Sequence, residues 1–192
     1  MEAIEEKTIG KYKIEIIPDT EPWDPRSDDN LGTMVCFSSR YNWGDKHDFP
    51  DPDQFAIFVA INRDKIITLP LYVYVHSGTT MNTTGFSCRF DSWCCGRIYV
   101  TKARVREEYG WKRVSKKRIA QIEDYLKGEV QTYDQYLTGD VYGYRITDTE
   151  TEEEVDSVWG YYGDEYCMTE AVAVAQHLMK SDKEGQLELD MK

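Results

Sequence analysis

The sequence lacks the hydrophobic segments that direct a protein into or across a membrane. It contains no run of about 18 apolar residues, the length that a membrane-spanning helix needs, and the residues after Met1 lack the apolar core of a signal peptide. Five cysteines, an odd number that includes the adjacent pair Cys94 and Cys95, favour a reducing compartment over a disulfide framework. We therefore expect a cytoplasmic protein that makes no membrane contact.

The motifs of common enzymes are also missing. There is no Gly-x-Gly-x-x-Gly or Walker loop, so the usual nucleotide sites are excluded. Histidine occurs only three times, and no serine or cysteine has the setting of a nucleophile elbow, so a hydrolase triad has little support. We expect no enzyme activity, no catalytic residue and no cofactor.

Three groups of residues could bind a metal ion, but another interpretation is stronger for each. The group His76, Cys88, Cys94 and Cys95 lies within 20 residues yet contains no Cys-x-x-Cys knuckle, so buried free thiols are favoured over zinc. The acids Asp45, Asp48, Asp51 and Asp53 lack the glycine and the bidentate glutamate of a calcium loop. The third group is Asp134, Asp140 and Asp156, which nothing in the sequence brings together. We expect no metal, and a small metal-dependent enzyme stays an alternative.

Basic residues are few relative to acids, and they are unevenly placed. The formal net charge of −12 disfavours non-specific attraction to nucleic acid, since like charges repel over a Debye length of about 8 Å at physiological salt. Residues 97–118 are the exception, with nine Lys or Arg against two glutamates, which leaves 14 basic and 33 acidic residues elsewhere. The sequence predicts two electrically distinct faces.

The length of 192 residues is enough to bury about two thirds of the unfolded surface around one core. We expect a flexible leader over residues 1–10, a single α+β domain over residues 11–180 and a charged tail over residues 181–192. The predicted architecture is a mainly antiparallel, twisted sheet packed against two longer helices and one short helix.

Strands are predicted where β-branched and aromatic residues concentrate or alternate with polar ones. They cover residues 11–17, 31–37, 65–76 and 96–100. Pro70 interrupts the third strand, which implies an edge position or a bulge. Residues 52–61 fit a helix capped by Asp51, and residues 55–61 fit a strand nearly as well, so we leave both open.

Helices are predicted from caps and from apolar periodicity. Thr101 and Gly110 have the positions of N-cap and terminator for a short helix over residues 102–109. Ser115 begins the best helix, and a last helix follows Gly163, with Asp164 and Glu165 in its first turn. The apolar stripe of the best helix, at steps of three or four, is Ile119, Ile122, Leu126, Val130, Tyr133 and Leu137.

A hairpin rich in aromatic residues follows, with strands at residues 141–146 and 155–162 and an acidic run between them. Alternation places Tyr142, Tyr144 and Ile146 on one face of the first strand. It places Val155, Ser157, Trp159 and Tyr161 on one face of the second strand. The tip is too polar to bury, so it should project into water as a negative knob.

A soluble turn is the simplest interpretation of these hairpin acids. The sharper hypothesis is a docking surface in which carboxylates replace phosphates in the arginine-rich groove of a nucleic-acid enzyme. The candidate partner-binding residues are Asp148, Glu150, Glu152, Glu153, Glu154 and Asp156, with Asp28 and Asp29 from an earlier acidic loop.

The basic segment offers a second surface, because Tyr99, Tyr109 and Trp111 are interleaved with its cations. Such a segment could grip RNA or a phosphate backbone, although a solvated helix surface is the more ordinary interpretation. The candidate nucleic-acid-binding residues are Lys102, Arg104, Arg106, Lys112, Arg113, Lys116, Lys117 and Arg118. A nucleic-acid-binding accessory protein is therefore an alternative function.

Four segments, residues 29–36, 40–45, 133–144 and 156–163, resemble a group of small proteins encoded by phages and mobile elements of Firmicutes. The similarity spans most of residues 11–163 and carries no catalytic residue. Proteins of that provenance include anti-restriction proteins and anti-CRISPR inhibitors, several of them acidic mimics of DNA. The resemblance therefore implies an anti-defence protein that binds a bacterial defence nuclease, with a Cas9-type effector and its guide RNA as the first candidate partner.

Overall fold

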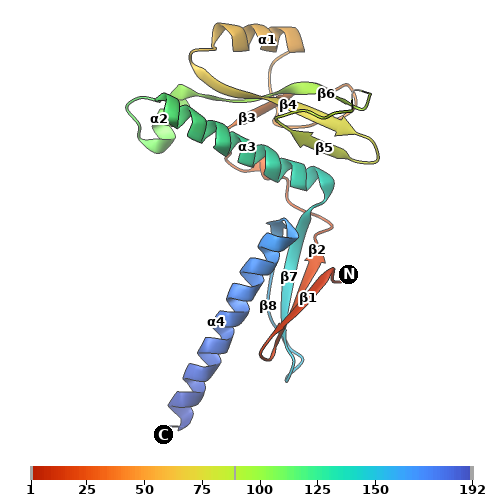
Figure 1. Ribbon diagram of the computed structural model, residues 1–192, viewed down its shortest axis with the longest axis vertical. Coiled ribbons are helices and arrows are strands. Elements are labelled where there is room, and N and C mark those ends of the chain that lie inside the picture. The colour runs from red at the N-terminus through yellow and green to blue at the C-terminus, as the bar shows by residue number, and fades with distance from the viewer. Residues whose placement is uncertain (1, 89, 191–192) are drawn as a thin grey trace. The chain divides into compact units, whose positions relative to one another are not determined.

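The structure is a computed structural model that describes residues 2–88 and 90–190, with side chains through residue 182 (Figure 1). It confirms an α+β protein, but the described residues form two antiparallel four-stranded sheets rather than one, with four α-helices. The chain divides into two compact units where we expected one domain. Unit 1 combines the chain up to Trp23 with the chain from Gly139 onward, and unit 2 is Asp24–Thr138. Unit 2 is thus inserted into the connection between two paired strands of unit 1.

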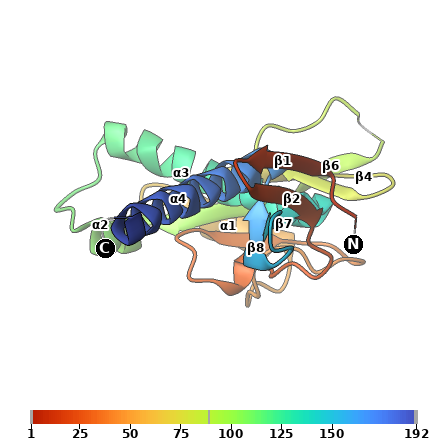
Figure 2. The same ribbon diagram turned by 90° about the horizontal axis from the view of Figure 1, so that it is seen from below.

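Unit 1 is a sheet with one long helix along one face (Figures 1 and 2). The strands are β1 (Glu5–Ile9), β2 (Tyr12–Pro18), β7 (Val141–Asp148) and β8 (Glu154–Tyr162), in that spatial order, and the helix is α4 (Asp164–Asp190). The core between them includes Ile14, Ile16, Tyr144, Ile146, Cys167, Ala171 and Ala175. The apolar side of α4 packs here, while its opposite side, with Glu165, Thr169 and Gln176, is exposed.

Both predicted ends of the domain differ from expectation. Residues 5–9, expected in a flexible leader, form β1 and pair with Tyr12–Ile16 of β2. Residues 181–190, expected in a charged tail, continue α4. Lys11 and Asp182 are 3.0 Å apart, so an ion pair of unit 1 reaches one residue of that segment.

The β7–β8 hairpin forms as predicted, but the predicted face of β8 is broken by a bulge. Asp156 and Val158 lie opposite Ile146 and Tyr144, on the face that α4 covers, and the register shifts before Tyr161 pairs with Tyr142. Gly160 has a φ of 85° in this irregularity. Because of the shift, Tyr161 joins the core while Trp159 lies on the opposite face against Gly143.

Unit 2 is a sheet with helices on both faces. Its strands are β3 (Thr33–Cys36), β4 (Ile66–Val75), β5 (Thr79–Asn82) and β6 (Ser92–Thr101), in the order β3-β6-β4-β5. Its helices are η1 (Pro25–Ser27), α1 (Pro52–Ile61), α2 (Lys102–Tyr109) and α3 (Lys116–Thr138). Ile98 and Val100 of β6 pack with the stripe of α3, whereas the intervening Tyr99 contacts Phe55 and Phe58 of α1.

The predicted helix starts are confirmed by their caps. Asp51 accepts from the amide of Gln54, so residues 52–61 form a helix rather than a strand. Thr101 caps α2, and Gly110 ends it in the left-handed conformation with a φ of 63°. Ser115 accepts from Arg118 at the start of α3. Ile122, Leu126, Val130 and Tyr133 of the predicted stripe are buried.

Pro70 is tolerated in β4 for the reasons that the sequence suggested. The register of β4 with β6 shifts between Leu71 and Tyr72, next to the proline. The short strand β5 pairs only with Tyr72–Val75, so Pro70 has a partner strand on one side alone. On the side without a partner strand, the missing N–H of Pro70 therefore costs no hydrogen bond between strands.

A buried ion triad holds the loops of unit 2 against α3. The Arg26 side chain is 4% exposed. It donates from Nε and Nη2 to the two carboxylate oxygens of Asp45 at 2.8 and 2.7 Å, and from Nη1 to Glu129 at 2.9 Å. The second oxygen of Glu129 accepts from the amides of Leu31 and Gly32. Every member is hydrogen-bonded, which is the condition under which buried charge is tolerated.

We predict that Arg26→Met destabilises unit 2 by about 3–5 kcal/mol, because it leaves two carboxylates without their cation. Chemical denaturation followed by tryptophan fluorescence and circular dichroism measures the change. Arg104→Met is the matched control, since Arg104 forms an exposed pair with Asp29 and its loss should cost less than about 1 kcal/mol. Equal losses in the two variants would contradict this role for the triad.

No helix in the described part of the chain is both long enough and apolar enough to cross a membrane.

Candidate functional site

The β7–β8 tip is an ordered turn held by the β1–β2 connection of the same unit. Asp148 is 5% exposed and binds Lys11 Nζ at 2.9 Å, and its side chain accepts from the amide of Glu150 at 2.9 Å. The amide and hydroxyl of Thr149 both donate to the carbonyl of Lys11 at 2.8 Å. Glu152 adopts a φ of 60°, and its amide donates to the carbonyl of Asp148. The turn therefore has a fixed backbone.

Asp148 and Asp156 do not belong to the exposed acidic surface in which the sequence placed them. The hydrogen bond from Lys11, with a second from the amide of Glu150, holds the pKa of Asp148 below its usual value. Asp156 is half-buried and accepts from the hydroxyl of Tyr144 at 2.9 Å. Burial, followed by this hydrogen bond, raises the pKa of Tyr144, so the hydroxyl stays a donor. Both aspartates are structural in this geometry.

The remaining four predicted hairpin acids are all exposed. They are Glu150, Glu152, Glu153 and Glu154. Glu154 accepts from the hydroxyl of Ser157 at 2.7 Å, and none of the four forms an ion pair with a described residue. The structure thus brings four of the six hairpin candidates to one solvated tip, where their charges are not neutralised.

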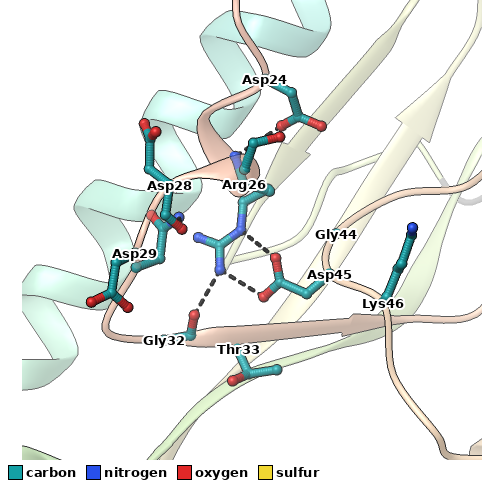
Figure 3. Close-up of a pocket in the computed structure, with 11 residues that line it drawn as sticks. Asp24, Arg26, Asp28, Asp29, Gly32, Thr33, Gly44, Asp45 and Lys46 are labelled. Atoms are coloured by element: carbon teal, nitrogen blue, oxygen red, sulfur yellow. Dashed lines mark hydrogen bonds and ion pairs between the residues drawn. The ribbon is translucent and has the colours of Figure 1, made fainter.

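Asp28 and Asp29, the other acidic candidates, belong to unit 2 and line an open depression of about 520 Å³ (Figure 3). Both are exposed, and Asp29 accepts from Arg104 at 2.7 Å. Figure 3 shows the guanidinium of Arg26 turned toward Asp45 and the carbonyl of Gly32. The guanidinium of Arg26 is therefore already engaged, whereas Lys46, which also lines the depression, is exposed beside the carboxylates.

The predicted basic residues separate into structural ones and exposed ones. Lys102 donates to the carbonyl of Asp64, and Arg104 donates to Asp29 and the carbonyl of Asn30. Arg118 lies 4.3 Å from the ring centre of Trp111, which also stacks with Tyr109 at 4.6 Å. These contacts fix the connection between α2 and α3.

Five other cations surround that connection, and none forms an ion pair with a described residue. All five are exposed, and they are Arg106, Lys112, Arg113, Lys116 and Lys117. They belong to α2, to the connection and to the first turn of α3. The structure therefore places a compact cationic patch on unit 2, and the partly buried Trp111 sits among its charges.

The described residues contain no cluster of three or more His, Cys, Asp or Glu side chains that could hold a metal ion. The three sequence candidates are accordingly dispersed. Asp134 accepts from the amide of Met81 at 2.7 Å, Cys95 is buried while Cys94 is exposed, and Asp45 binds Arg26. A metal-dependent enzyme therefore gains no support from these side chains.

Sequence reasoning missed the triad of Arg26, Asp45 and Glu129 and the thiol pair of Cys36 and Cys95. The two sulfur atoms of the pair are 3.5 Å apart between neighbouring strands. The neighbouring thiol and burial raise the pKa of Cys36, so Cys36 is a protonated packing residue. The triad members lie 19 and 103 residues apart in the chain, and no local signal connects them.

Comparison with protein-family models, with curated proteins and with solved structures found no match.

We predict that part of the stability of unit 1 is lost in acid through Asp148. Its pKa in the unfolded chain is about 3.9, and its folded pKa is lower, so its contribution is present above that unfolded value and declines as pH falls through the folded one. The stability difference between the wild type and Asp148→Asn should therefore shrink between about pH 5 and pH 2.

Unfolding free energies measured at intervals of pH test this prediction. Lys11→Met should also reduce this pH-dependent part, and the double variant should lose less than the sum of the two single variants, because the two side chains share one contact. A wild type and an Asp148→Asn variant that differ by a constant amount at every pH would contradict it.

Proposed function

We propose that this chain is an anti-defence protein of a phage or mobile element that binds a bacterial defence nuclease through the hairpin tip. The observation that carries the proposal is the solvated group of Glu150, Glu152, Glu153 and Glu154 on a turn held by Asp148 and Lys11. The binding partner is a cationic cleft that normally takes nucleic acid, and a Cas9-type effector is the first target to test.

The charge density of the tip supports this kind of mimicry. Five residues span at most about 17 Å when fully extended, so four carboxylates over residues 150–154 give at least one charge per about 4 Å. A single strand of DNA carries one phosphate per about 3.4 Å. A cleft with arginines spaced for phosphates could therefore pair with carboxylates at this spacing.

The rigid turn also supports binding energetically. Ordering a free loop at an interface costs free energy, and a turn that is already hydrogen-bonded avoids much of that cost. The net charge of −12 adds long-range attraction to a basic groove, which raises the association rate at low salt. Inhibition by this mechanism needs no catalytic residue.

We predict that reversing Glu150, Glu152, Glu153 and Glu154 to Lys slows association with a Cas9–guide complex by about 10-fold to 1,000-fold at low salt, and that target-DNA binding by the complex recovers. Surface plasmon resonance over a salt series measures the rate. The matched control reverses four exposed acids elsewhere, Glu2, Glu5, Glu21 and Glu108, for the same change in net charge. An equal loss of association rate in both variants would show that net charge alone attracts the complex. No association of the wild type at low salt would rule out a Cas9-type effector as the target.

A second candidate function is nucleic-acid binding by unit 2. The specific observation in its favour is the exposed patch of Arg106, Lys112, Arg113, Lys116 and Lys117 around the stacked Tyr109 and Trp111. Arg118 already contacts Trp111, which leaves cationic phosphate contacts as the main source of affinity rather than base stacking. Within an anti-defence protein, such a patch would touch guide RNA.

We predict that, if the patch binds RNA, affinity for a single-stranded oligonucleotide at about 50 mM salt falls steeply as salt rises. Replacing the five cations by Gln should reduce the slope of log K against log salt by about 0.7 for each phosphate that the variant no longer neutralises. Electrophoretic mobility and fluorescence anisotropy measure both effects. Unchanged mobility of RNA and DNA at low salt would eliminate this candidate, and Lys102→Gln, outside the patch, serves as the control variant.

A further inference from the structure

Exposed sheet edges attract other strands, and three of the four edge strands in the two described sheets are protected. In unit 1, β1 is five residues long and includes Glu5, Glu6 and Lys7. In unit 2, β5 has only four residues, and the four-residue β3 is covered by a bridge from Val35 to Gly44 and by the Asp45 amide bonding to Met34. Short length, charge and coverage are the usual ways in which proteins block an edge.

The fourth edge, β8, lacks most of these protections. It is nine residues long, contains no Lys, Arg or Pro, and pairs only with β7 among the described residues. Val155, Val158 and Trp159 along it are 40%, 39% and 44% exposed. Irregularities in register flank the segment Asp156–Val158 and leave its pairing with β7 continuous. A nine-residue edge with no second partner strand among the described residues, and with these exposed apolar side chains along it, is a template for one more strand.

The side chains around β8 indicate the chemistry of that strand. Glu152, Glu153 and Glu154 are exposed and lead into the regular segment, so the electrostatic field at this end of the edge is negative. Trp159 rests on Gly143, where a Cβ atom would lie 2.4 Å from its ring, and the ring is therefore held in place while still exposed. A fixed indole face favours a cation, particularly an arginine. A second copy of this chain would bring the same acids and is disfavoured.

We propose that an extended, basic segment of the target protein adds to the free edge of β8 as a fifth strand of the unit 1 sheet. The main-chain hydrogen bonds supply affinity, while lysine or arginine side chains on the added strand meet the acids and Trp159. This inference rests on the proposed function for the identity of the partner, since the glutamate tip leads directly into β8 along the chain.

A capped synthetic peptide of alternating lysine and valine is the probe. Calorimetry at low salt measures its affinity for the full chain, and amide hydrogen exchange by NMR locates it. We expect binding together with slowed exchange of β8 amides beyond that seen in the free protein. No binding at low salt, or binding without protection of β8, would overturn the proposal.

Two N-methylated analogues separate strand addition from charge attraction. One is methylated at every lysine nitrogen of the backbone and the other at every valine nitrogen, so each analogue loses the donors along one edge while its charge is unchanged. Strand addition predicts that at least one analogue binds at least tenfold more weakly than the parent peptide. Affinities within twofold of the parent for both analogues would overturn the proposal in favour of side-chain attraction.

A pair of protein variants provides the matched control. Val155→Lys adds an edge lysine to β8 and should weaken the parent peptide at least tenfold. Thr8→Lys adds the same charge to β1 at the other edge of the sheet, about 14 Å away at strand spacing, and should change affinity less than twofold at physiological salt. Equal weakening in both variants would overturn the proposal. The N-methylated peptides are tested on the wild type, so the test does not depend on the folding of either variant.

Two further measurements distinguish a failure of strand addition from a failure of the proposed function. Ultracentrifugation of the protein alone that shows a dimer with protected β8 amides would overturn the proposal by making a second copy the occupant. The second measurement is inhibition of target-DNA binding by the Cas9–guide complex. Inhibition that depends on the four tip glutamates but is unchanged in Val155→Lys would support the proposed function and overturn strand addition. Absence of inhibition by the wild type, together with peptide binding at β8, would overturn the proposed function and support strand addition.

Discussion

The contact between Asp148 and Lys11 determines how the acidic hairpin is presented. Lys11 lies at the β1–β2 turn, and it binds both Asp148 and Asp182, so one ammonium group joins the hairpin, the edge of the sheet and α4. The carboxylate that makes this contact is unavailable to a partner, but it orders the turn on which four other carboxylates are displayed. One buried acid therefore gives the exposed acids a fixed geometry, and the same division of roles recurs in unit 2, where Asp45 and Glu129 bind Arg26 while Asp28 and Asp29 stay exposed.

Local signals predicted most of the elements correctly. Caps at Asp51, Thr101 and Ser115 and the apolar stripe of α3 act over a few residues, and each was confirmed. The division into two sheets was not predictable in this way, because β2 and β7 read as strands but their pairing depends on residues more than 120 positions apart. β1 was missed because its charged residues give an edge strand no apolar pattern, and the face of β8 was wrong because a bulge at Gly160 shifts the alternation.

The candidate surfaces were predictable in composition but not in detail. Runs of like charge in the sequence correctly indicated exposed acids at the tip and exposed cations near Trp111. The sequence could not indicate which of these residues bind partners within the protein. Their partners come close only in the folded chain, as they do for Asp148, Asp156, Lys102 and Arg104. The open edge of β8 was equally invisible, since an edge is a property of neighbouring strands and not of the strand itself.

The insertion of unit 2 between β2 and β7 has a consequence for the order of events during synthesis. β2 is translated before any residue of unit 2, yet its partner β7 follows the whole of unit 2. The residues of unit 2 are thus all synthesised before β7, so unit 2 can fold while β1 and β2 are still an isolated hairpin. Such a hairpin is marginally stable at best in water. A ribosome that pauses after Thr138 would hold a nascent chain with one sheet complete and the other half built, and an exposed hairpin for chaperones to bind.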